Sequence, residues 1–269
     1  MLVSVIIPLY KGRKYIPRLI RIIEYNKQNL YGINDVELIF VNDYPDEIIS
    51  EEDIRSNDIK TKLVVNPQNY GIHKSRIIGL ENASGEYILF LDQDDVIKRD
   101  CIDKQLEAIK DDSDVVVCNG IVKAPTYRKI LYKYWFMHIT VKYLFFYTKF
   151  GCRIISPGQC LIRRDSIPEL WKREVLKNNG ADDFFLWILM LSEGKRFTIN
   201  REPLYLHIIH NNNTSNDENT IKDSTMEVAG LLKTNNAVSR WHLNHIKKLA
   251  SQEKGFLVRT VEKINVIRK

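Results

Sequence analysis

The sequence lacks the features that mark disulfide-stapled, zinc-clustered or membrane-spanning proteins. Its four cysteines form no C-x-x-C pair, which argues against a zinc cluster and a disulfide framework and favours reduced thiols. No uninterrupted apolar run reaches the roughly 20 residues that a transmembrane helix requires. The basic residues near the N-terminus follow the first apolar run, whereas in a secretory signal they precede it. We therefore expect a cytoplasmic protein.

The composition is that of a globular protein with a substantial core. The 269 residues are 44% hydrophobic and include 40 Lys and Arg against 34 Asp and Glu, which excludes intrinsic disorder and coiled coil. This length accommodates one large α/β domain or one domain with an appendage.

Positive charge is concentrated in two segments of the chain. Residues 123–150 contain six basic and no acidic residues, together with ten of the 27 aromatic residues. Residues 229–269 contain nine basic and two acidic residues, so the remainder of the chain is acidic. The aromatic residues fit a core covered by solvated lysines, a dimer face, or a segment that contacts a membrane surface. The acidic remainder and the lack of a known motif argue against nucleic-acid binding.

The first third alternates short apolar runs with segments of helical period, which predicts a βαβα unit with a parallel sheet. Strands are predicted at Val3–Leu9, Val36–Val41, Lys62–Val65 and Gly85–Leu91, and helices at Tyr15–Asn26 and His73–Asn82. In such sheets ligands bind beyond the carboxyl ends of the strands. Asp43 and Asp92 both occupy that position.

The rest of the chain is less regular. We expect strands at Val115–Cys118 and Gln159–Arg163, a helix at Asp182–Ser192, a polar loop from Asn211 to about Asp223, and basic amphipathic helices from about residue 226. The composition suggests three parts, 1–122, 123–222 and 223–269.

The carboxylates of Asp92, Asp94 and Asp95 are the sharpest local feature. Three acids in four residues repel one another, so a bound cation is the natural compensation. The alternative is that they open the next helix, where aspartate is favoured.

Asp182 and Asp183 also allow two interpretations. They can complement a helix dipole, or one of them can accept a proton during catalysis.

Several ordered motifs resemble glycosyltransferase family two, whose members have the GT-A fold. They are Ser4-Val5-Ile6-Ile7-Pro8-Leu9-Tyr10, Val41-Asn42-Asp43, Asn69-Tyr70-Gly71 with Ser75-Arg76, and Ala83-Ser84-Gly85 leading to Asp92-Gln93-Asp94-Asp95. The resemblance covers about the first 100 residues. It departs from the family pattern at Tyr44-Pro45, Ile77 and Asp182, which puts the identity of the nucleotide in doubt more than the reaction.

The resemblance implies roles for individual residues. Tyr10 would pack on the nucleotide base, Asp43 would hydrogen-bond it, and Asp92 would approach the ribose. Asp94 would hold Mn²⁺ or Mg²⁺ against the diphosphate, and Asp183 would deprotonate the acceptor. Pro8, Arg76 and Gln93 would also line the donor site, and His210 would approach the metal.

The implied activity is inverting, metal-dependent transfer of a sugar from a nucleoside diphosphate, with a UDP-sugar favoured. The acceptor would be a glycan or a polyprenyl-linked hydroxyl. Residues 1–122 would bind the donor, 123–222 the acceptor, and 223–269 would form a helical extension. A lipid-linked acceptor would bring the protein to the inner face of the cell membrane.

Two other readings stay open at this point. The run from Asp92 to Val96 also matches the DxDx[TV] motif of haloacid-dehalogenase-like phosphatases, although those enzymes carry it on the first strand. A non-catalytic module that binds a membrane surface would use the basic aromatic segments.

Overall fold

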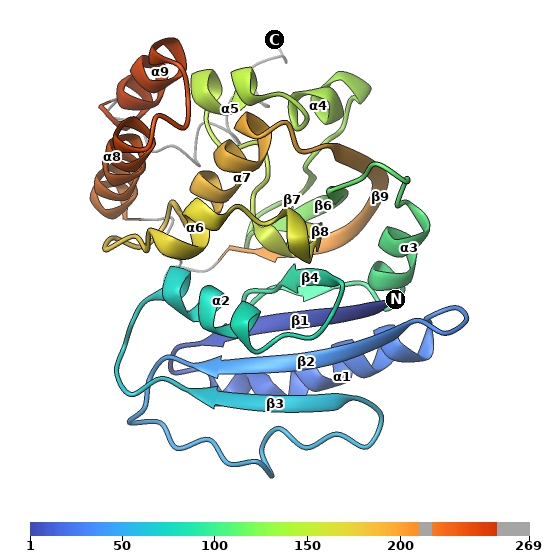
Figure 1. The fold of residues 1–269 in the computed structure, drawn as a ribbon. Coiled ribbons are helices and arrows are strands. Elements are labelled where there is room, and N and C mark those ends of the chain that lie inside the picture. Colours follow the sequence, from blue (N-terminus) through green and yellow to red (C-terminus); the bar gives the residue numbers. More distant parts are fainter. Residues whose placement is uncertain (210–216, 252–269) are drawn as a thin grey trace.

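The computed structural model describes residues 1–209 and 217–251, and within them one mixed sheet of nine strands is flanked by helices (Figure 1). The strands are β1 (Leu2–Leu9), β2 (Asp35–Asn42), β3 (Lys60–Val65), β4 (Tyr87–Phe90), β5 (Val96–Ile97), β6 (Val115–Lys123), β7 (Arg128–Ile130), β8 (Cys160–Arg163) and β9 (Phe197–Ile208). The helices are α1 (Ile16–Gln28), α2 (Ile72–Glu81), α3 (Cys101–Glu107), α4 (Trp135–Thr140), α5 (Leu144–Phe150), α6 (Glu169–Arg173), α7 (Asp182–Ser192), α8 (Glu218–Thr234) and α9 (Arg240–Ala250).

The expected α/β fold class is confirmed, and its parallel part lies in the N-terminal half. The order along the sheet is β3-β2-β1-β4-β8-β6-β9-β5, with β7 paired to β6. Strands β1 to β4 pair in parallel, whereas β8 runs antiparallel to both β4 and β6. The long strand β9, which the sequence pattern did not indicate, pairs in parallel with β6. One sheet therefore runs through both halves of the chain.

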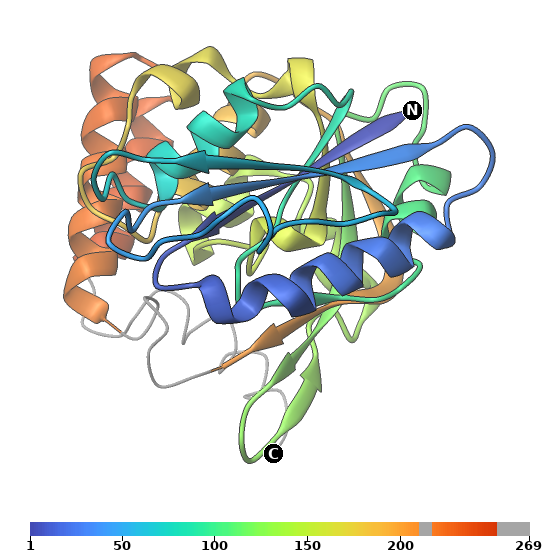
Figure 2. The ribbon, with the colours of Figure 1, turned by 90° about the horizontal axis from the view of Figure 1, so that it is seen from below.

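Helices α1 and α2 cover opposite faces of the parallel strands (Figure 2). Strand β1 is apolar on both faces, as buried parallel strands are. Val5 and Ile7 belong to the same core cluster as Leu19 of α1, while Ile6 belongs to the cluster that contains Leu80 of α2. This packing leaves the carboxyl ends of the strands free to form a site.

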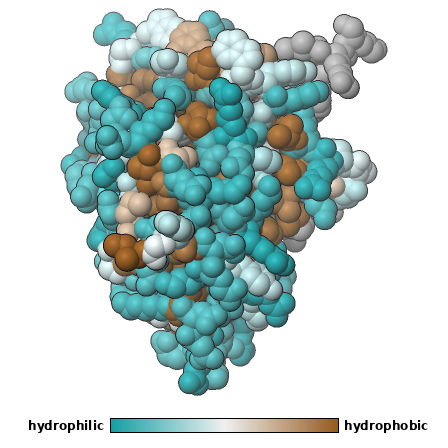
Figure 3. Space-filling view, turned by 90° about the vertical axis from the view of Figure 1, so that its right-hand side faces the viewer, coloured by the Kyte–Doolittle hydropathy of each residue, from teal (hydrophilic) through white to brown (hydrophobic). Residues whose placement is uncertain are grey.

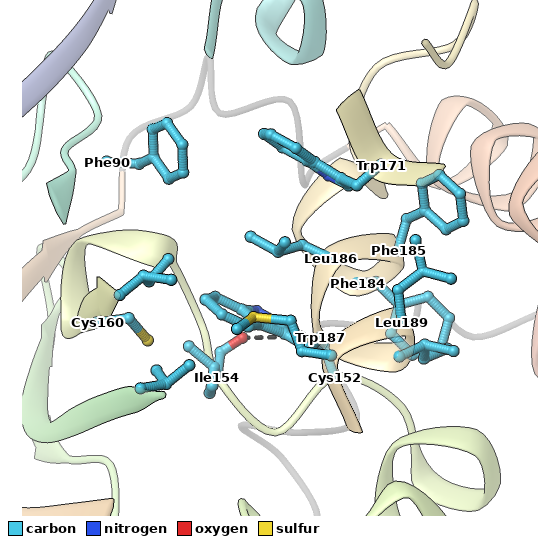
Figure 4. Close-up of a cluster of buried hydrophobic side chains, with 14 of the residues drawn as sticks. Phe90, Cys152, Ile154, Cys160, Trp171, Phe184, Phe185, Leu186, Trp187 and Leu189 are labelled. Carbon is cyan, nitrogen blue, oxygen red and sulfur yellow. Dashed lines mark hydrogen bonds between the residues drawn. The ribbon is translucent and has the colours of Figure 1, made fainter. Parts of the chain in front are cut away.

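Helix α7 is apolar around its circumference from Phe184 to Met190, so this stretch is buried on all sides. Its residues Phe184 to Leu189 pack with Phe90 and Trp171 in the cluster drawn in Figure 4. The indole Nε1 of Trp171 donates a hydrogen bond of 2.9 Å to the carbonyl of Asp182. The first turn of α7, which carries Asp182 and Asp183, is thus fixed by the core.

The polar loop expected up to about Asp223 ends earlier than predicted. Helix α8 starts at Glu218, because the carboxylate of Asp217 accepts hydrogen bonds from the backbone N–H groups of Asn219 and Thr220. Of the basic helices expected after residue 226, α9 is found, whereas the second half of α8 carries one acidic and one basic side chain. Residues 252–269 lie outside the described part of the chain. His210 lies outside the described residues.

None of the helices in the described ranges combines the length and the apolar character that membrane crossing demands.

Candidate active site

The loops that follow β1, β2 and β4 meet at one edge of the sheet. The N–H of Asp43 donates to the carbonyl of Leu9 at 2.8 Å, and the N–H of Leu91 donates to the carbonyl of Ile6 at 3.0 Å. Parallel strands in register end together, so Tyr10, Asp43 and Asp92 are neighbours. This is the arrangement that the sequence pattern predicts.

The Tyr10 ring is half-exposed at the mouth of this edge. It meets the Tyr44 ring edge to face at 5.3 Å, and the ammonium of Lys11 lies 5.5 Å from the first ring centroid and 5.0 Å from the second. Gln93 fixes the Tyr10 backbone with two hydrogen bonds, accepting from its N–H at 3.0 Å and donating to its carbonyl at 3.2 Å. Pro8 is buried within β1. The structure therefore presents an open aromatic face on a held backbone.

Asp43 is buried and occupied by hydrogen bonds from the protein. Its carboxylate accepts from Asn66 Nδ2 at 2.7 Å and from the N–H groups of Tyr70 and Gly71 at 2.8 Å each. Gly71 has a φ of 83°, in the left-handed region that favours glycine, and the next residue begins α2. Asp43 thus organises the turn that leads into α2.

Arg76 joins the two halves of the site. Its Nη2 donates to Asp92 Oδ1 and its Nη1 to Asp182 Oδ2, both at 2.5 Å. The hydroxyl of Ser156 donates to the other oxygen of Asp92 at 3.2 Å. The sequence placed Arg76 at the donor, but the structure buries its guanidinium between two carboxylates.

Charge balance keeps this bridge ionised. Burial alone would lower the pKa of Arg76, but the carboxylates of Asp182 and Asp92 outweigh burial and raise it above its ordinary value. Burial raises the pKa of Asp92, and Arg76 opposes that shift. A buried arginine between two acids is therefore a fixed positive charge within the site.

The three acids of the 92–95 run have separate surroundings. Asp95 is buried and accepts hydrogen bonds from the Tyr205 hydroxyl and from Nδ1 of His207 at 3.1 Å, so it anchors β9. Asp92 is bound to Arg76. For Asp94, no other described side chain donates a hydrogen bond, and burial with the nearby Asp95 and Asp92 raises its pKa. The protein itself compensates two of the three carboxylates that the sequence assigned to a cation.

Asp94 is the carboxylate able to take a hard cation. Among residues 1–209 and 217–251, no three His, Cys, Asp or Glu side chains converge into a metal cage. Mg²⁺ and similar ions typically use one or two carboxylates with water and substrate phosphates, so a single open carboxylate with anionic neighbours fits such an ion. His207, which the sequence reasoning missed, lies close enough to Asp94 for its charge to act on that carboxylate.

Asp183 has a carboxylate with a raised pKa at the start of α7. It lies in the first turn of α7, and its Oδ1 accepts the N–H of Phe184 at 2.6 Å. Burial raises the pKa of Asp183 to about 7, and the charge of Asp182 raises it while that of Arg76 lowers it. A carboxylate with a pKa near neutrality is suited to general base catalysis.

Comparison with known proteins identifies relatives that cover part of the sequence. A curated protein of Haemophilus influenzae, named an uncharacterized glycosyltransferase, is 36% identical over 108 residues, which are 39% of this chain and 41% of that protein. The dolichol-phosphate mannosyltransferase of Pyrococcus furiosus is 30% identical over 139 residues, which are 49% of this chain and 39% of that protein. The chain thus spans about two fifths of the length of these relatives.

Solved structures match over nearly the whole chain. The crystal structure of TarS residues 1–349 from S. aureus matches with a TM-score of 0.63 at 19% identity, covering 92% of this chain and 69% of that one. The mannosyltransferase PcManGT from Pyrobaculum calidifontis, solved with GDP-Man and Mn²⁺, matches with a TM-score of 0.61 at 14% identity, covering 98% and 74%. These similarities establish a shared fold, the GT-A fold expected from the motifs.

The phosphatase reading does not fit the order of the chain. Its nucleophile would follow the first strand, whereas Asp92 follows β4, after β1, β2 and β3.

The family model described as glycosyl transferase family 2 matches residues 4–171, which is more than half of the sequence. The motifs, the fold and this match agree: the chain belongs to glycosyl transferase family 2.

Proposed function

We propose that this protein transfers a sugar from a nucleoside diphosphate to an acceptor hydroxyl, with inversion at the anomeric carbon. The observation that carries the proposal is the Arg76 bridge, which ties Asp92, at the end of β4, to the first turn of α7 beside Asp183. The bridge thereby holds Asp92, on the proposed donor side, close to Asp183, the proposed base with a pKa of about 7.

The donor would bind across the edge formed by β1, β2 and β4. Tyr10 offers an exposed ring for the base, and Gln93 holds the Tyr10 backbone. Asp92, whose Oδ2 accepts a hydrogen bond from the Ser156 hydroxyl, would approach the ribose. Asp43 would accept from the base only in addition to its three bonds within the protein. TarS has been solved with UDP and with UDP-GlcNAc, and PcManGT with GDP-Man. We favour a UDP-sugar as the donor of this chain.

Asp94 would hold Mn²⁺ or Mg²⁺ against the diphosphate. Its support is the carboxylate that no other described side chain occupies, in a setting of excess negative charge. A bound divalent ion supplies charge neutralisation for the leaving diphosphate. His210 stays a proposed ligand outside the described residues, and His207 stands next to Asp95 on the same side.

Asp183 would act as the general base. Its carboxylate accepts the proton of the acceptor hydroxyl while the hydroxyl oxygen forms a bond to the anomeric carbon. The bond from that carbon to the diphosphate oxygen breaks on the opposite face, so the configuration inverts.

The second half of the chain would bind the acceptor, a glycan or a lipid-linked hydroxyl. Helix α7, which carries Asp183, belongs to this half. If the acceptor is lipid-linked, the protein would act at the inner face of the cell membrane.

A screen of donor hydrolysis tests the proposed function. Full-length protein is incubated with UDP-, GDP-, CDP- and dTDP-sugars, with and without Mn²⁺, and nucleotide release is measured. We expect metal-dependent release from one class of donor, reduced by Asp183→Asn. Release from none of them, with folded protein, would contradict the proposal.

A further inference from the structure

Most aromatic side chains of residues 123–150 lie at the surface rather than in the core. Of its ten aromatic side chains, Tyr132 and Tyr147 are buried. The exposed ones are Tyr127, Tyr134, Trp135, Phe136, Tyr143, Phe145 and Phe150. Trp135 is 68% exposed and Tyr143 is 55% exposed. Scattered exposed apolar residues are ordinary, but seven exposed aromatic side chains within 24 residues are a marked concentration along the chain.

Two helices from distant parts of the chain build this patch together. The rings of Phe145 on α5 and Trp241 on α9 stack at 5.7 Å with an interplanar angle of 15°. The hydroxyl of Thr148 and Nδ1 of His242 lie 2.9 Å apart and join the same two helices. Trp241 and Phe145 are both exposed, so the stacked pair presents apolar surface to the solvent.

Lysine side chains lie among these rings. The ammonium of Lys149 lies 5.3 Å from the Phe145 ring centroid, and that of Lys133 lies 5.3 Å from the Tyr134 centroid. Lys142, Lys247 and Lys248 are also exposed. Neither residues 123–150 nor α9 contains an acidic side chain.

Helices α4, α5 and α9 lie at one end of the molecule (Figure 1). Seen from the side in Figure 3, white and brown side chains lie at the top of the molecule, the end to which these helices belong; brown ones also run down the middle of this face, and the lowest part is mostly teal. We define the aromatic–basic end by its exposed aromatic and lysine side chains: Tyr134, Trp135, Phe136, Tyr143, Phe145, Phe150 and Trp241, with Lys133, Lys142 and Lys149.

We propose that the aromatic–basic end binds the headgroup region of an anionic lipid bilayer. Trp and Tyr favour the membrane–water interface, and exposed lysines add attraction to anionic headgroups. A protein partner or a second copy would also cover apolar rings, but neither residues 123–150 nor α9 offers an acidic side chain to pair with these lysines, as a self-complementary face would need. The charge therefore selects an anionic lipid surface.

The position of this end relates it to the proposed active site. Helix α5 packs against α7, whose first turn carries Asp183. The chain then runs from the end of α5 at Phe150 to Ser156, whose hydroxyl bonds Asp92. A bilayer at this end would face the acceptor side of the site, so the inference adds a partner to the proposed function.

Vesicle co-sedimentation of the full-length protein tests the proposal. Sucrose-loaded vesicles of phosphatidylcholine alone are compared with vesicles that also contain phosphatidylglycerol, at low and high salt. We expect binding to the anionic vesicles that weakens at high salt. No binding to the anionic vesicles would overturn the proposal, as would equal binding to both kinds.

Matched variants locate the contact. Trp135→Ser combined with Phe150→Ser should weaken vesicle binding on the order of tenfold. Lys142→Gln and Lys149→Gln should each weaken it about fivefold. The control is Tyr31→Ser with Ile33→Ser, which removes side chains 82% and 96% exposed between α1 and β2 and should leave binding unchanged. An equal loss in the control, or none in the other variants, would overturn the proposal.

Two further measurements distinguish a lipid surface from a second copy of the chain, and this inference from the proposed function. If the aromatic–basic end joins two copies, light scattering will show a dimer that Trp135→Ser/Phe150→Ser converts to a monomer without vesicle binding, and this would overturn the proposal. Donor hydrolysis in solution should be unchanged in all four variants. A protein that binds vesicles but releases no nucleotide would contradict the proposed function and leave this inference standing.

Discussion

Arg76 and Asp182 lie 106 residues apart in the sequence, yet Nη1 of the arginine is 2.5 Å from Oδ2 of the aspartate, and both side chains are almost inaccessible to water. The other Nη of Arg76 holds Asp92. Removing one partner of a buried ion pair leaves an uncompensated charge, so this bridge is expected to matter for stability as well as for the geometry of the site.

Arg76→Met should lower the free energy of unfolding by about 3–5 kcal/mol at pH 7.5, because the buried carboxylate of Asp182 and the partly buried one of Asp92 lose their counter-ion. The deficit should shrink as the pH falls, since protonated carboxyls need no cation. Urea denaturation at pH 7.5 and pH 5 measures both effects. Arg55→Met, which removes an exposed pair with Glu52, should cost less than about 1 kcal/mol. Similar losses of unfolding free energy in Arg76→Met and Arg55→Met would show that the Arg76 bridge does not stabilise the protein.

Asp183→Asn should reduce kcat by roughly 10²–10⁴ while donor binding is retained, because only the proton acceptor is lost. A base works in its deprotonated form, so wild-type kcat/KM should rise with pH through the region of its pKa of about 7 and then level off. The variant should lose this rising limb. Pre-steady-state rates across pH 5.5–9 test the point, with exposed Asp111→Asn as the control. Unchanged turnover in Asp183→Asn would move the base to another acid.

Tyr10→Ala should weaken UDP binding by about 1–3 kcal/mol, which is the range for stacking of a base on an aromatic ring. Its ring is half-exposed and touches Tyr44 only edge-on, so the free energy of unfolding should change little. Calorimetric titration with UDP and with pyrophosphate separates the causes, because pyrophosphate has no base to stack. An equal loss for both ligands would exclude stacking.

Asp43→Asn should destabilise the protein by about 2–4 kcal/mol, because the new amide cannot accept all three hydrogen bonds from Asn66, Tyr70 and Gly71. UDP affinity should fall with it, since the turn into α2 borders the site. Thermal denaturation with and without UDP measures both. Full stability in this variant would show that Asp43 does not organise the turn.

Local patterns were enough to predict the parallel half of the fold. Continuous apolar runs and helical periods fix β1, α1, β2 and α2 within a few residues, and parallel strands necessarily bring their carboxyl ends together. The acids at those ends were therefore found from the sequence.

The contacts that distribute the charges were beyond such reasoning. Arg76 meets Asp182, and Asp95 meets Tyr205 and His207, only through tertiary packing of α7 and β9. Composition also could not separate core from surface in residues 123–150, because apolar side chains occur in both. The alternation of side chains from Leu204 to Ile208 was the one local signal that could have revealed β9 and its His207.

The central claim is that Asp94 holds a divalent ion that in turn binds a diphosphate. Titration of UDP into wild type and Asp94→Ala, each with Mn²⁺ and with EDTA, tests it most directly. We predict that Mn²⁺ strengthens UDP binding to the wild type at least tenfold. In the folded Asp94→Ala variant, the affinity for UDP should be the same with Mn²⁺ and with EDTA. Equal strengthening in both proteins, or none in the wild type, would contradict the claim.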